Sequence, residues 1–219
     1  DVYKRQLLDS SLDRAQKRDG IAGLVSAITA AVPGRRNLVV KWNAWDIFQW
    51  ELLHDLYPEV PGLMLVRDPV EILASHHRQA GRHMSGDPSL AGAGPVFCCG
   101  SGNQPFVSVL DHRMRVLQAM MERMRDLHES QGVPVLHYRQ LDAEAMEQIA
   151  RRFDLHAGEA ARQRIAARLR QHAKALDQRF EPDGRDKAAV FGESERQRIE
   201  ARLGPLHAQL LRRAQPVNE

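Results

Sequence analysis

The segment LMLVRDPVEILAS, residues 63–75, is the most informative part of the chain. Its first four residues form a continuous apolar run, which is typical of a buried strand in a parallel sheet. Asp68 can cap a helix that Pro69 opens, and the helical pattern runs to residue 80, just before Gly81. The segment therefore predicts a strand over 63–67, a tight turn and a helix over 69–80. Arg67 then lies at the carboxyl end of the strand, where α/β proteins bind ligands.

The alternation of strands and helices continues on both sides of this segment. Apolar runs predict two further strands over residues 37–41 and 133–138. Residues 82–104 are rich in Gly, Ser and Pro, and we expect a long surface loop there. Together these patterns predict an α/β domain with a mostly parallel sheet flanked by helices. The remaining helices are predicted over residues 21–32, 46–57, 106–130, 143–153, 159–175 and 193–214.

Composition excludes several classes of protein. The chain has 219 residues, of which 43% are hydrophobic and 27% charged, and these values are those of a globular domain rather than a disordered one. No apolar run approaches the ~18 residues of a membrane-spanning helix. The two cysteines are adjacent, Cys98 and Cys99, which excludes a disulfide-stapled module and favours a cytoplasmic protein. The formal net charge of +3 is compatible with an anionic ligand but does not by itself indicate nucleic acid.

Arg67 and Ser75 are the first candidate binding residues. A guanidinium fork and a hydroxyl make a sound phosphate clamp, because charge-assisted hydrogen bonds to oxyanions are short and strong. The two residues could approach one phosphate if the strand end folds over the helix that carries Ser75. The structural alternative is that Arg67 pairs locally at a strand–helix turn and that Ser75 is an ordinary helical serine.

Residues 63–75 resemble the second nucleotide motif of the sulfotransferases that use 3′-phosphoadenosine 5′-phosphosulfate (PAPS), bacterial members included. In that family the strand-end Arg and the Ser eight residues later hold the 3′-phosphate. The resemblance covers about residues 20–190 and includes three further segments. These are LVVKWNAWDIFQWELLHDLYPEVP (38–61), VPVLHYRQLDAEAMEQIARRFDL (133–155) and KALDQRFEPDGRDK (174–187).

This resemblance implies a parallel sheet of the P-loop nucleotide-hydrolase type. It also implies transfer of a sulfuryl group from PAPS to a hydroxyl or amine of a small-molecule, glycan or peptide acceptor. By the same resemblance, Arg67 and Ser75 would bind the 3′-phosphate, and Lys41 would end the first predicted strand near the sulfonate. No metal is expected, because His76, His77 and His83 lack the spacing of a ligand set.

The chain departs from the family pattern in two places. The Gly-rich phosphate loop of the family is missing, and residues 1–6, DVYKRQ, match a translated sequencing-transposon end. We therefore expect residues 7–219 to be an N-terminally truncated domain, inactive alone, with a helical C-terminal segment over 142–214. Where many members carry a catalytic His, this chain has Asn43, so the general base is unassigned. The candidates for that base are Asp46, His54, His76, His77 and His83.

Two other functions fit parts of the sequence. One is an ATP-using, kinase-like enzyme of the P-loop type, which would prefer ATP to a 3′-phosphorylated nucleotide. The other is a non-catalytic protein with basic helices that binds RNA, and its binding would depend steeply on salt and survive loss of Arg67.

Overall fold

The computed structural model describes residues 12–31, 34, 37–85, 108–155, 158–171 and 189–214. The chain divides into two units. Unit 1 comprises Asp1–Pro61 and Ala80–Arg123, and unit 2 comprises Gly62–Gln79 and Met124–Glu219. Each unit is described by itself.

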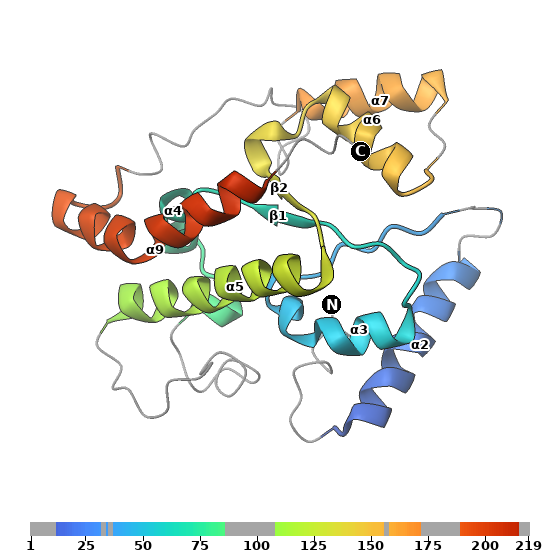
Figure 1. The fold of residues 1–219 in the computed structure, drawn as a ribbon, viewed down its shortest axis with the longest axis horizontal. Coiled ribbons are helices and arrows are strands. Elements are labelled where there is room, and N and C mark those ends of the chain that lie inside the picture. The colour runs from blue at the N-terminus through green and yellow to red at the C-terminus, as the bar shows by residue number, and fades with distance from the viewer. Residues whose placement is uncertain are drawn as a thin grey trace. The chain divides into compact units, whose positions relative to one another are not determined.

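Unit 2 contains a parallel pair of strands. Strand β1 spans Met64–Val66 and strand β2 spans Val135–His137, with Leu65 opposite Leu136 (Figure 1). Both strands lie inside the predicted strands 63–67 and 133–138, so these two predictions are confirmed. Helix α4, Pro69–Arg78, follows β1 directly, as the position of Pro69 predicts.

Helix α9, Glu193–Arg213, packs against α4 and β2 and completes the core of unit 2 (Figure 1). Apolar residues at helical spacing on α9 are fully buried, as expected for a helix that covers a sheet. The buried apolar side chains of this unit include Val66, Leu73, Leu127, Leu136, Ile199, Leu203 and Leu210.

The remaining helices of unit 2 follow β2. A 3-10 turn, η4, covers Tyr138–Gln140, and helices α6, Ala143–Arg152, and α7, Glu159–Leu169, pack against each other. Asp142 caps α6 by accepting a hydrogen bond from the Ala145 amide at 2.8 Å. The predicted helices over 143–153 and 159–175 are confirmed, although α7 ends at Leu169.

Unit 1 is helical in its described part. Helix α2, Arg14–Ala31, packs on α3, Trp50–Leu56, around the buried Ile21 and Leu52. A 3-10 helix, η2, covers Ala44–Gln49 and leads into α3, and a short one, η3, covers Arg82–Met84.

Helix α5, Val109–Gln131, is shared by the two units, because the division falls after Arg123. Gly132 follows it with a φ of +67°, a left-handed conformation that glycine adopts without the steric cost of a Cβ. The turn at Gly132 ends α5 and directs the chain into β2.

One predicted strand is absent. Residues 37–41 form no strand in the described structure, and Val39 is 70% exposed. An apolar run becomes a buried strand only where neighbouring strands pair with it and helices cover it, and no described segment does so here. Most of the predicted loop at 82–104 lies outside the described residues.

In its described part the chain is a mixed α/β protein with many helices and a two-stranded parallel sheet. None of the helices described is long and apolar enough to cross a membrane.

Candidate functional site

The candidate site lies at the carboxyl ends of β1 and β2. Because the strands are parallel and Val66 pairs with His137, the residues that follow each strand emerge at the same edge of the sheet. Arg67 follows β1, and Tyr138 and Arg139 follow β2. Two segments far apart in the sequence thus bring cationic side chains to one place.

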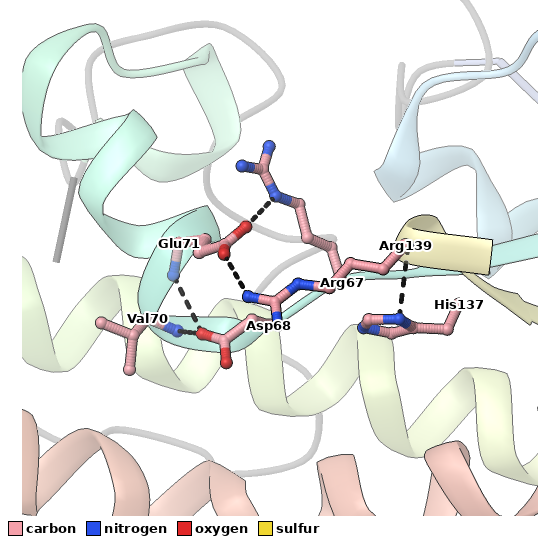
Figure 2. Close-up of polar contacts among 6 residues, drawn as sticks. All are labelled: Arg67, Asp68, Val70, Glu71, His137 and Arg139. Atoms are coloured by element: carbon pink, nitrogen blue, oxygen red, sulfur yellow. Dashed lines mark hydrogen bonds and ion pairs between the residues drawn. The ribbon is translucent and has the colours of Figure 1, made fainter. Parts of the chain in front are cut away.

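The carboxylate of Glu71, in the first turn of α4, binds both of these arginines (Figure 2). Its Oε2 accepts a hydrogen bond from Nε of Arg67 at 2.8 Å, and its Oε1 accepts one from Nη2 of Arg139 at 2.8 Å. The Glu71 side chain is only 10% exposed. One nearly buried carboxylate therefore holds two guanidinium groups that come from different strand ends.

The environment of Glu71 keeps this carboxylate ionised. Burial raises its pKa, but the hydrogen bonds from Arg139 and Arg67 and the charges of both groups outweigh burial, so the pKa lies below its ordinary value. The same interaction with Glu71 raises the pKa of Arg139. Glu71 is therefore ionised at neutral pH and faces two guanidinium groups.

Asp68 determines where Glu71 lies, because it caps α4. Its Oδ1 accepts hydrogen bonds from the amides of Val70 and Glu71 at 2.9 and 3.1 Å (Figure 2). The cap fixes the first helical turn and with it the backbone of Glu71. These two amides of the helix N-terminus are therefore already bonded inside the protein.

Tyr138 and His137 complete the surroundings of the two arginines. The guanidinium carbon of Arg67 lies 5.2 Å from the centre of the Tyr138 ring, a cation–π distance. Nδ1 of His137 accepts a hydrogen bond from the Arg139 amide at 3.3 Å, so this nitrogen is unprotonated (Figure 2).

The His137 ring also lies 5.9 Å from the ring of His207 on α9. Burial lowers the pKa of both histidines, which favours their neutral forms.

The structure places the predicted binding residues in two groups. Arg67 lies at the carboxyl end of β1, as predicted, and Ser75 lies in the second turn of α4, half-buried. Lys41 lies in unit 1, exposed, in a segment that forms no strand. The interpretation of Lys41 as a strand-end residue is therefore wrong, because no described strand pairs with residues 37–41.

The five candidates for a general base are divided between the two units, three in unit 1 and two in unit 2. Asp46 and His83 are buried in unit 1, where Asp46 accepts a hydrogen bond from the Asn43 amide at 2.8 Å and His83 packs on Trp45 at 4.4 Å. His54, also in unit 1, stacks on Trp50.

His76 and His77 occupy the last turn of α4, and the His77 ring contacts Phe191 edge-on. That end of α4 is opposite to the turn that carries Glu71.

Sequence reasoning did not single out Glu71, Tyr138 or Arg139 as site residues. The spacing of Arg67 and Glu71 was a usable signal, since an arginine just before a capped helix can reach a carboxylate in the first helical turn. Arg139 gave no such signal, because its proximity to Glu71 depends on the register of two distant strands.

Among the described residues, no group of three or more His, Cys, Asp or Glu side chains is arranged to hold a metal ion. Comparison of the chain with protein-family models, with curated proteins and with solved structures finds no match.

Proposed function

We propose that this chain is part of a sulfotransferase that moves a sulfuryl group from PAPS to a hydroxyl or amine acceptor. In this proposal the carboxyl end of β1 binds the 3′-phosphate of the nucleotide. That phosphate does not react, and its role is to fix the nucleotide so that the sulfur is correctly oriented.

The observation that carries the proposal is the hydrogen bonding of the Arg67 guanidinium, which leaves its two terminal nitrogens available to a ligand. Glu71 takes the Nε–H, and no other described residue bonds the two terminal nitrogens. The terminal N–H groups of an arginine match the oxygens of a phosphate in geometry and charge. Ser75, on the helix that follows, offers a hydroxyl as a second donor.

The chemistry of the transfer defines what the protein must supply. The acceptor oxygen or nitrogen attacks sulfur in line and gives up its proton to a general base or to solvent. The bond between sulfur and the nucleotide's phosphate oxygen breaks with its electron pair staying on that oxygen, and adenosine 3′,5′-bisphosphate leaves. Such a reaction depends on positioning and charge stabilisation more than on covalent help from side chains. Arg67 and Ser75 would contribute positioning, at a distance from the reacting atoms.

Binding of matched nucleotides tests the proposal. Adenosine 3′,5′-bisphosphate and adenosine 5′-diphosphate carry the same number of phosphates, but only the first has a 3′-phosphate. In isothermal titration calorimetry we expect tighter binding of the first, and we expect Arg67→Ala to weaken it by about 10- to 100-fold.

Arg164→Ala, at an exposed position of α7, is the matched control and should leave this binding unchanged. ATP is titrated as a third ligand, and tighter binding of ATP than of adenosine 3′,5′-bisphosphate would favour a kinase-like enzyme. Equal binding of adenosine 3′,5′-bisphosphate by the wild type and by Arg67→Ala would contradict the proposal. Binding of RNA that depends steeply on salt and survives Arg67→Ala would favour the interaction protein.

A further inference from the structure

The pairing of two arginines with one carboxylate differs from an ordinary ion pair. A carboxylate and one arginine commonly form two parallel hydrogen bonds, which satisfy both partners. Here each oxygen of Glu71 binds a different arginine, and each arginine gives Glu71 a single N–H. The remaining guanidinium N–H groups of Arg67 and Arg139 bond no other described residue.

The exposure of the three side chains shows that the guanidinium N–H groups are accessible from solvent. Glu71 is nearly buried, Arg67 is 28% exposed and Arg139 is 68% exposed. The negative group thus lies beneath two positive groups that reach solvent, and the three together carry a net charge of +1. A solvent-borne anion would meet guanidinium groups before it met the carboxylate.

Tyr138 and Asp68 lie beside the two arginines and affect how an anion could bind. The Tyr138 ring lies at a cation–π distance from the Arg67 guanidinium. Asp68 adds a negative charge, but its Oδ1 is bonded to two amides at the positive end of α4, which offsets that charge locally. An anion would therefore depend on the guanidinium N–H groups rather than on the helix N-terminus.

We propose that Arg139 is a second anion-binding residue beside Arg67, and that Glu71 is the residue that positions both. The ligand class is a tetrahedral oxyanion carried as a monoester, that is, a phosphate or sulfate group on a larger molecule. Under the proposed function this group is the 3′-phosphate of the nucleotide, and in this respect the inference rests on that function.

The effect of Glu71→Gln on anion binding has opposite signs if Glu71 positions the arginines and if it acts only through its charge. Removing a negative charge next to an anion site should tighten anion binding if only charge matters. If Glu71 acts by holding the two guanidinium groups in place, its removal should weaken binding, because the arginines lose their preorganised geometry. Glu71→Gln keeps the shape of the side chain and changes its charge.

The experiment is calorimetric titration of adenosine 3′,5′-bisphosphate and of inorganic pyrophosphate into the chain and its variants. We expect Arg139→Ala to weaken binding of the nucleotide by about 10-fold and Glu71→Gln to weaken it, whereas Arg164→Ala leaves it unchanged. In an Arg139→Ala background, Glu71→Gln should have a smaller effect than alone, since one of the groups it positions is gone. Far-ultraviolet circular dichroism of each variant checks that it is folded.

The outcomes separate the inference from the proposed function. Unchanged binding in Arg139→Ala, or tighter binding in Glu71→Gln, would overturn the inference while a loss in Arg67→Ala still supported the function. Pyrophosphate binding that needs both arginines, without a preference for the 3′-phosphorylated nucleotide, would support the inference and contradict the function. Should Glu71→Gln fail to fold, Arg139→Ala and Arg139→Lys still decide, because Arg139 is largely exposed. We expect lysine to restore only part of the binding, since it lacks the fork of N–H groups.

Discussion

At the scale of single residues, Glu71 has the largest influence on the site. It is one of the few charged side chains buried in the described structure, and its two partners come from β1 and from the turn after β2. A buried charge that loses its partners is costly, whereas the same charge with two hydrogen bonds is stabilising. Glu71 thus couples the stability of unit 2 to the geometry of its two arginines.

We predict that Glu71→Gln lowers the free energy of unfolding by about 1–3 kcal/mol, because one of the two acceptor oxygens becomes an amide NH2 and the other no longer belongs to an ionised group. The effect should depend on pH. The pKa of Glu71 is lowered in the fold, so its contribution is fully present above its ordinary value of 4.5 and is lost as the pH falls through the lower folded value.

Urea denaturation at neutral pH and at increasingly acidic pH measures both effects. Glu59→Gln, at an exposed position of unit 1, is the control and should change stability by less than about 0.5 kcal/mol. A difference between wild type and Glu71→Gln that stays constant into strong acid would contradict the assignment.

At the scale of secondary-structure elements, the contact of β2 with α9 includes the pair His137 and His207. Each histidine has a lowered pKa, caused first by burial, and the pKa of His137 is lowered further by the charges of His207 and Arg139. Asp68 acts in the opposite direction on both, as do Glu71 on His137 and Glu200 on His207. The net effect is that the folded state prefers neutral imidazoles at this contact.

The consequence is a loss of stability in mild acid. A histidine with a lowered folded pKa contributes fully above its ordinary value of 6.5, and its contribution declines as the pH falls from there toward the folded value. We predict that His207→Gln flattens the decline in the free energy of unfolding between neutral pH and mild acid. The measurement is chemical denaturation across that range, with His54→Gln in unit 1 as the control; equal slopes in wild type and His207→Gln would refute the prediction.

Most elements of the described structure could be predicted from local patterns. Asp68, Pro69 and the apolar spacing of α4 are signals that lie within a few residues of one another, and the strands at 64–66 and 135–137 lie inside continuous apolar runs. The strand expected at 37–41 fails because its burial would depend on neighbours that no local pattern specifies. Arg139 was missed for the same physical reason, since only the register of β1 with β2 brings it to Glu71.

At the scale of the whole molecule, unit 2 depends on α9 for its core. Leu203 on α9 is fully buried, whereas Leu211 on the same helix is 39% exposed. Leu203→Ala should lower the free energy of unfolding by about 2–5 kcal/mol, because it removes buried methyl groups and leaves a cavity. Leu211→Ala should lower the free energy of unfolding much less, because this side chain is partly exposed.

Denaturant unfolding followed by circular dichroism compares the two variants. Hydrogen exchange adds a regional test, in which the amides of α4 and β2 should exchange faster in Leu203→Ala, because α9 packs against both elements. Equal losses of stability in the two variants would show that α9 does not cover this core.

The division of each unit into two chain segments has a consequence for biosynthesis. Residues 80–123 belong to unit 1, so the ribosome makes β1 and α4 well before β2 and α9. The apolar face of α4 stays uncovered until α9 has been synthesised. During that time the exposed face can bind chaperones or aggregate. A nascent chain that stops within α5 already carries Arg67 and Glu71 but lacks Arg139. The complete cluster of these three residues therefore forms only after Arg139 has been synthesised.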